Sequence, residues 1–283
     1  MKTIENKTLD EERALYNLTQ AQVLNCAFAG AADGESALKQ CRNIHVENCT
    51  FSLRYPLWHT DNFTVKCCTM DEFARAAVWY SNNGKFYDCK LGGIKIFREC
   101  NGIYLENCYI SSFESGWRCN DVTLKNCKVH SEYFMLEAKN ITLDGVEMTG
   151  KYYMQYVENV TAENIKIDTK DAFWHAKNVT VKNSVLKGEY LGWYSEGLTL
   201  INCVICGTQP LCYCKNLKLI NCRTEGCDWA FEYSEVEAEI SGGIVSIRNP
   251  LSGKIQVDSV EELDLENQIV PCTAQIIIGG KKI

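Results

Sequence analysis

The chain has 283 residues, a formal net charge of −7 at neutral pH and a pI near 5.3. An acidic surface repels the phosphates of nucleic acids and of anionic lipids, so we expect neither a nucleic acid nor a membrane as partner. No apolar run approaches the length of a membrane span, and the N-terminus lacks the apolar segment of a signal peptide.

Residues 1–24 are predicted to form the first coil and N-terminal cap of a stacked structure. The motif of residues 10–15, Asp-Glu-Glu-Arg-Ala-Leu, recurs 23 residues later as Asp-Gly-Glu-Ser-Ala-Leu. Residues 8–16 look helical when taken alone, but a segment that recurs in register belongs to the repeat. We therefore expect the repeat to begin at the N-terminus.

Residues 25–245 repeat with a period near 19 residues. Asparagine or a related residue recurs at one position of the repeat: Asn25, Asn48, Cys67, Asp88, Asn107, Asn126, Gly145, Asn164, Asn183, Asn202 and Asn221. The preceding residues, such as Val122-Thr-Leu-Lys, alternate apolar and polar side chains with the period of a β-strand. Asparagine tolerates positive φ angles, so each one predicts a sharp corner, and a second corner column lies five residues earlier.

A period of this length predicts a solenoid, in which residues one period apart lie above one another. The fold class is therefore all-β: a single-stranded right-handed parallel β-helix of about 12 coils of about 19 residues, with three short strands per coil. We expect the corner asparagines to stack inside the coil. The unbroken repeat indicates one domain over residues 1–283, in which residues 246–283 form the last coils and a C-terminal cap.

Most of the seventeen cysteines follow the repeat rather than a metal-binding or disulfide pattern. Eight of them come directly after the corner position, where a small side chain that points inward fits the core. No paired CxxC motifs occur, so we expect no metal and no cofactor. Many unpaired thiols favour a reducing compartment, and the predicted location is the cytoplasm.

The stacked corners resemble those of the pectate-lyase-like superfamily of right-handed β-helices. More closely, the motifs Gly34-Glu-Ser-Ala-Leu, Tyr55-Pro-Leu-Trp-His and Arg75-Ala-Ala-Val-Trp-Tyr resemble an uncharacterised family of bacterial β-helix proteins known as domain of unknown function 3737. The resemblance implies a fold and no chemistry. The polygalacturonase motifs Asn-Thr-Asp, Asp-Asp and Gly-His-Gly, and the aspartates that bind calcium in pectate lyases, are absent.

The third strand of each coil carries the candidate functional residues. Two columns, four residues apart, are polar or aromatic in nearly every coil, and residues four apart on a strand share a face. Rings can stack on sugars, and carboxylates and arginine can bind hydroxyl groups. The predicted substrate-binding residues are Tyr133, Tyr152, Tyr156, Tyr190, Tyr194 and Tyr213. The candidate catalytic residues are Glu99, Arg118, Glu137, Asp171 and His175.

These columns support three hypotheses. The first is a protein that binds carbohydrate, and the second is a glycan-active enzyme of the glycoside hydrolase or polysaccharide lyase type. The third is a structural or protein-interaction solenoid without a ligand. In that case the ladders of like residues only stabilise the fold. A tryptophan column of Trp58, Trp117, Trp174 and Trp193 would mark a homo-oligomer interface if exposed, and the sequence leaves its direction open.

Overall fold

The computed structural model describes residues 2–283, and every regular element in this range is a β-strand. Contacts group the described residues into two compact units, the first ending at Thr142 and the second beginning at Leu143. In both units the chain winds as a parallel β-solenoid, with about 15 turns of about 19 residues in total. The total exceeds the expected dozen coils.

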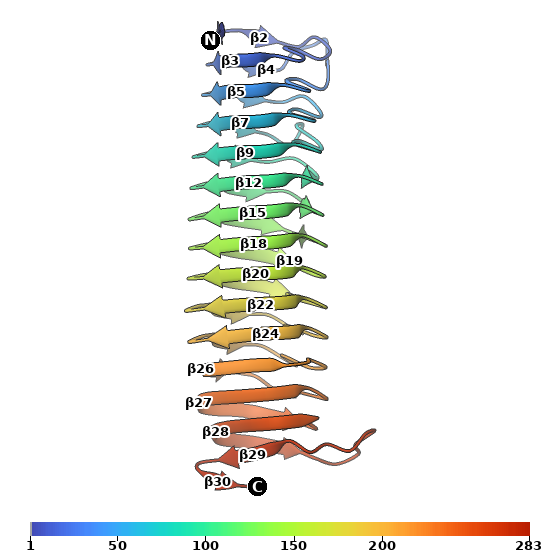
Figure 1. Ribbon diagram of the computed structural model, residues 1–283, viewed down its shortest axis with the longest axis vertical. Coiled ribbons are helices and arrows are strands. Elements are labelled where there is room, and N and C mark those ends of the chain that lie inside the picture. Colours follow the sequence, from blue (N-terminus) through green and yellow to red (C-terminus); the bar gives the residue numbers. More distant parts are fainter. Residues whose placement is uncertain (1) are drawn as a thin grey trace. The chain divides into compact units, whose positions relative to one another are not determined.

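The first unit repeats a long strand, a short strand and a third segment in each coil (Figure 1). The long strands, on what we call the first side, are β1 (Lys2–Glu5), β3 (Thr19–Leu24), β5 (Arg42–Glu47), β7 (Asp61–Lys66), β9 (Asn82–Tyr87), β12 (Asn101–Glu106) and β15 (Asn120–Lys125). The short strands, on the second side, are β2 (Thr8–Leu9), β4 (Ala27–Phe28), β6 (Thr50–Phe51), β8 (Thr69–Met70), β10 (Lys90–Leu91), β13 (Tyr109–Ser111) and β16 (Lys128–Ser131). On the third side, only β11 (Ile96–Arg98), β14 (Glu114–Trp117) and β17 (Tyr133–Phe134) are strands.

The second unit has the same first and second sides. The first-side strands are β20 (Glu158–Glu163), β22 (Lys177–Lys182) and β24 (Glu196–Ile201), and the second-side strands are β19 (Glu147–Lys151), β21 (Lys166–Lys170), β23 (Val185–Lys187) and β25 (Val204–Cys206). Strand β18 (Lys139–Asp144) crosses the boundary between the units. Toward the C-terminus the strands lengthen to β26 (Leu217–Glu225), β27 (Glu235–Arg248) and β28 (Ser252–Asp264), followed by β29 (Gln275–Ile278) and β30 (Lys281–Lys282).

Strand register follows the sequence period. Strands β5 and β7 pair in parallel with Ile44 opposite Phe63, and β20 and β22 pair with Val160 opposite Val179. Like residues therefore stack in the core, as in the ring pair Phe28–Phe51, whose centroids are 4.7 Å apart. The last strand, β30, turns back antiparallel to β29, which ends the parallel pairing. No helix within residues 2–283 is long and apolar enough to cross a membrane.

Both corner columns have the positive φ angles that the sequence predicts. The φ angle is 54° at Asn107, 52° at Asn183 and 53° at Asn202, and 53° at Asn178 in the second column. The expectation that the asparagine side chains lie inside the coil is wrong, because they are exposed. On the outside they bond one another: the amide of Asn221 donates to Asn202 at 2.8 Å.

The cysteine columns are buried, as predicted. Fourteen of the seventeen thiols are buried, Cys67 is exposed, and Cys206 and Cys272 are half-buried. Each inward thiol lies beside main-chain carbonyls; the Cys203 thiol, for example, is 3.3 Å from the Ile201 oxygen. Burial raises the pKa of the Cys41 thiol to about 11, so this group stays protonated at neutral pH.

Candidate functional site

The third side differs from an ordinary strand in most coils. In residues 190–194 the φ angles are 56° at Tyr190, 72° at Gly192 and 58° at Tyr194. Their amides bond alternately to the next and the preceding coil: Tyr190 donates to Thr208 at 3.1 Å and Gly192 donates to Ala172 at 2.8 Å. A left-handed residue costs about 1–2 kcal/mol unless it is glycine, and the bonds to both neighbours offset that cost.

This backbone changes which side chains face outward. In a strand, successive side chains alternate between the two faces. Here they alternate in pairs: Leu191 and Gly192 are buried, Trp193 is half-buried and Tyr194 is exposed. Residues four apart share a face, as the sequence analysis expected, but the cause is a run of alternating φ signs. The same conformation continues through β11 and β14, where φ is 54° at Phe97 and 76° at Gly116 and consecutive residues such as Ile96 and Phe97 are both buried.

The tryptophan column lies on the outside of the coil, half-buried. Its indole N–H groups donate to carbonyls of the adjacent coil, from Trp58 to Ala76 at 2.6 Å and from Trp193 to Gln209 at 2.6 Å. In the first unit Trp58 also stacks on Trp79, and the Arg98 guanidinium lies over the rings of Trp79 and Trp117. These contacts hold the tryptophans flat against the coil.

An aromatic ladder runs along the third side of the second unit. It consists of Tyr156, His175, Tyr194 and Tyr213, four of the residues that the sequence analysis singled out. Successive ring centroids are 5.1, 4.9 and 4.8 Å apart, with interplanar angles of 11°, 11° and 12°. The rings therefore cover one another's faces, and solvent reaches their edges and hydroxyl groups. Sugar rings cannot stack on the inner members of this ladder, but hydroxyl groups can bond to its edge.

The ladder also sets the properties of its ionisable groups. Desolvation lowers the pKa of His175, which favours the neutral imidazole between the rings. The Tyr213 hydroxyl donates to the Glu232 carboxylate at 2.7 Å, and burial together with this bond raises the pKa of Tyr213. At neutral pH both shifts favour the uncharged forms of His175 and Tyr213.

Asp171 lies below the surface rather than beside His175. It is 5% exposed, its Oδ1 atom has no hydrogen-bond partner, and burial raises the pKa of this carboxyl. Within the described residues no hydrogen bond or ion pair joins Asp171 to His175. A carboxyl at this depth does not reach a ligand on the outer surface.

The candidates in the first unit form an exposed ion pair and a packed ring. Arg118 Nε and Glu137 Oε2 are 2.8 Å apart, and this pairing raises the pKa of Arg118. Glu99 is exposed and makes no ion pair with Arg118 within 4.0 Å. The half-buried Tyr133 ring lies against Trp117 at 6.0 Å. Tyr152, in the second unit, is also half-buried.

A groove that the sequence analysis missed lies beside the ladder in the second unit. Its volume is about 540 Å³. Its floor includes four glycines at multiples of the 19-residue period: Gly150, Gly188, Gly207 and Gly226. We call it the glycine groove, and the period of these glycines is the signal that could have revealed it.

Close contact between coils requires two of these glycines. A Cβ on Gly188 would lie 1.6 Å from the Thr169 oxygen, and one on Gly207 would lie 2.3 Å from the Gly188 oxygen. Their φ angles of 151° and 122° also favour glycine. With no side chains here, the floor lies below the flanking charged columns.

Paired charges form both rims of the glycine groove. Lys187 Nζ lies 2.9 Å from Asp168 on one rim, and Lys170 Nζ lies 3.1 Å from Glu189 on the other. Lys170 also lies over the Tyr190 ring at 5.1 Å, and that ring contacts Trp193 beside the ladder. The glycine groove and the ladder are therefore two parts of one surface.

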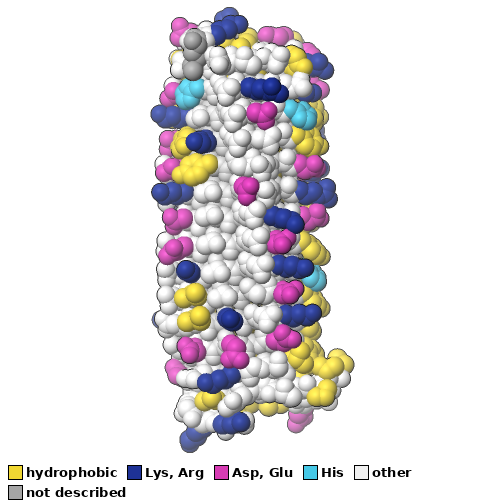
Figure 2. All heavy atoms as spheres, in the orientation of Figure 1, with side chains coloured by type: hydrophobic (Ala, Val, Ile, Leu, Met, Phe, Trp, Pro, Cys, Tyr) yellow, Lys and Arg dark blue, Asp and Glu magenta, His cyan; other side chains and the backbone are white. Residues whose placement is uncertain are grey.

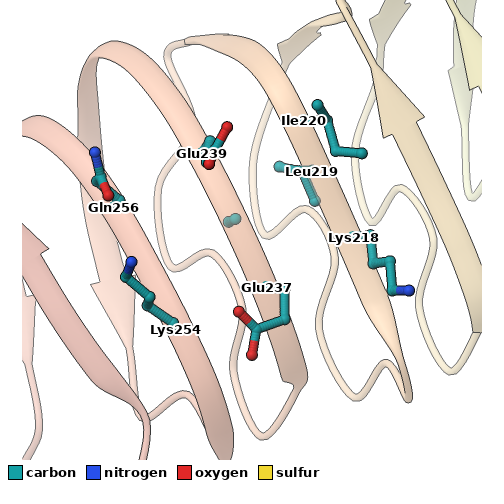
Figure 3. Close-up of a pocket in the computed structure, with 8 residues that line it drawn as sticks. Lys218, Leu219, Ile220, Glu237, Glu239, Lys254 and Gln256 are labelled. Atoms are coloured by element: carbon teal, nitrogen blue, oxygen red, sulfur yellow. The ribbon is translucent and has the colours of Figure 1, made fainter.

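The first side is flatter. Figure 2 shows acidic and basic side chains alternating along one margin of the second unit, and in the strand register Lys177 lies opposite Glu196. Near the C-terminus a depression of about 360 Å³ lies over β26, β27 and β28 (Figure 3). There Lys218, Glu237 and Lys254 form one row of outward side chains. These residues are ordinary outward positions of neighbouring strands.

Comparison with known proteins identifies the family. The family model described as "Protein of unknown function (DUF3737)" matches residues 2–278. The chain belongs to the DUF3737 family. No curated protein matches this DUF3737 sequence significantly.

Solved structures share the fold at low identity. A mutant of the tailspike protein of E. coli bacteriophage HK620, in complex with a pentasaccharide, is 12% identical with a TM-score of 0.51, covering 96% of this DUF3737 chain and 69% of its own. The Azotobacter vinelandii mannuronan C-5 epimerase AlgE6 A-module is 13% identical with a TM-score of 0.38, covering 98% and 87%. PfbA, a surface adhesin of Streptococcus pneumoniae, is 12% identical with a TM-score of 0.45, covering 99% and 83%.

Proposed function

We propose that this DUF3737 protein binds carbohydrate on the third side of its second unit, in the glycine groove and along the aromatic ladder. The observation that carries the proposal is the glycine groove itself, whose rims hold ion pairs at hydrogen-bonding distance. Carbohydrates present many hydroxyl groups that donate and accept at once. A rim such as Lys170–Glu189 offers a donor and an acceptor 3.1 Å apart, which suits two adjacent hydroxyl groups.

The repeat favours a linear ligand. Positions of the groove floor, its rims and the ladder recur once per coil, at a step of about 4.8 Å, although Thr169 replaces a floor glycine and Cys206 replaces a rim charge. An extended oligosaccharide laid along the coils would meet similar groups at each step. The exposed Tyr156 and Tyr194, at 53% and 42%, would supply hydroxyl groups to its edge.

The fold comparison supports the same class of ligand. The tailspike protein that shares this fold was solved with a bound pentasaccharide, so a solenoid surface of this type can hold an oligosaccharide. Identity of 12% carries no residue from one protein to the other. The proposal for this chain therefore depends on its own groove.

The test begins with a glycan array, followed by calorimetry on the best ligand. Glu189→Gln removes one rim charge, and Tyr194→Phe removes a hydroxyl group while keeping the stacked ring. Each variant should weaken binding about tenfold, which equals about 1.4 kcal/mol. Tyr109→Phe, an exposed tyrosine on the second side of the first unit, is the matched control and should bind like the wild type. Unchanged affinity in both test variants would refute the proposal.

A further inference from the structure

A second groove lies at the N-terminal end of the first unit, at the corner between the third and first sides. Its volume is about 490 Å³. Its two walls are formed by Gln40, His59 and Tyr80 on the third side and by Arg42, Asp61 and Asn82 at the start of the first-side strands. We call it the N-terminal groove.

The N-terminal groove exists because the residue between the two walls points inward in each coil. Cys41, Thr60 and Ser81 occupy these positions, and each is 0% exposed. The hydroxyl groups of Thr60 and Ser81 bond main-chain carbonyls of earlier coils, at 2.9 and 2.7 Å. The floor is therefore closed and fixed, and the outward walls bound an open trough.

Both walls are held in place before any ligand arrives. The Asp61 carboxylate accepts from the Asn82 amide at 2.8 Å and lies 3.6 Å from Arg42 Nε. On the other wall His59 stacks on Tyr80 at 5.1 Å with an interplanar angle of 16°. Ordered walls reduce the entropy lost on binding.

The chemistry of the walls defines the ligand class. The N-terminal groove has one guanidinium and one carboxylate, together with amide, imidazole and phenol groups, and no aliphatic side chain. The side chain of Arg42 is 68% exposed, so its outer N–H groups face solvent. An anion would compete with Asp61 for Arg42, whereas a neutral diol can donate to Asp61 and accept from Arg42.

We infer that the N-terminal groove is a separate binding site for a neutral saccharide. It shares the ligand class of the proposed function but none of its residues, because every group involved lies in the first unit. Its occupancy can be followed without enzymatic activity. The Trp58 ring lies 6.3 Å from His59 and 5.9 Å from Tyr80, so a bound ligand should move the Trp58 indole resonance.

The experiment is a titration of the full chain, labelled with nitrogen-15, with cellobiose, maltose and glucuronate, read from the six indole signals. A neutral disaccharide should shift the Trp58 signal. Asp61→Asn and Arg42→Gln should each weaken that binding about tenfold. Asp88→Asn, a corner carboxylate elsewhere in the first unit, is the matched control and should not change it.

Three outcomes would overturn the inference: no shift with either disaccharide, a response to glucuronate alone, or unchanged affinity in both variants. Tyr194→Phe separates the two proposals. If it weakens binding of the array ligand about tenfold and leaves the Trp58 titration unchanged, the sites are independent. If array binding fails for every glycan while the Trp58 shift persists, only the proposed function falls.

Discussion

The middle ring of the aromatic ladder provides the sharpest test of how the third side is held together. His175 stacks on Tyr156 at 5.1 Å and on Tyr194 at 4.9 Å, both at 11°. Each aromatic pair contributes about 0.5–1.5 kcal/mol beyond buried area, so His175→Ala should lower the free energy of unfolding by about 1–3 kcal/mol.

Equilibrium urea unfolding, followed by circular dichroism, measures this change. The control is Tyr109→Ala, because Tyr109 is 47% exposed and makes no ring pair within the described residues. That variant should stay within about 0.5 kcal/mol of the wild type. If His175→Ala falls in the same range as Tyr109→Ala, the stacking argument is refuted.

The same residue gives a pH dependence with a definite sign. Desolvation lowers the folded pKa of His175 below its ordinary value of 6.5, so the unfolded chain binds the proton more readily. Its contribution is fully present above pH 6.5 and is lost as the pH falls through the folded pKa. His175→Phe keeps the stack and removes the titration. The wild type should therefore lose stability relative to His175→Phe as the pH falls from 7 to 5, and parallel curves would contradict the assignment.

Three further outcomes follow from buried groups. Asp171→Asn should raise the free energy of unfolding at pH 7 by about 1 kcal/mol, because it removes a buried charge with an unbonded oxygen. The gain should vanish near pH 3, where the carboxyl is protonated in both the folded and the unfolded state. Thermal unfolding at both pH values tests this. Trp193→Phe should lower the free energy of unfolding by about 1–2 kcal/mol, because the Gln209 carbonyl loses the indole N–H that donates to it at 2.6 Å. Urea unfolding measures this change, and an unchanged midpoint would count against the hydrogen bond. Thiol titration of the native protein should label Cys67 rapidly, Cys206 and Cys272 slowly, and the fourteen buried cysteines only after denaturation; rapid labelling of most thiols would contradict the buried columns.

The solenoid, its corners and its buried thiols could be predicted because each depends on one residue and its period. Asparagine at 19-residue steps requires a repeated corner, and Asn107 and Asn202 have the expected positive φ. The period also makes Val160 and Val179 pair in register. A cysteine after each corner has one inward position to occupy. The backbone preference of each residue and the repeat period predict the same structure here, so these features can be predicted without knowledge of the tertiary contacts.

The backbone conformation of the third side, by contrast, depends on tertiary contacts. Tyr190 and Tyr194 adopt positive φ angles that such residues avoid in isolation, and main-chain bonds to adjacent coils stabilise this backbone. That backbone turns Trp193 outward and stacks Tyr194 face to face with His175, so their edges meet solvent. The volumes of the glycine groove and the N-terminal groove depend on which side chains point inward between the columns. The sequence alone determined the period, the corners and the buried cysteine columns. Which side chains of the third side reach the surface depends on backbone angles that only packed neighbouring coils can impose.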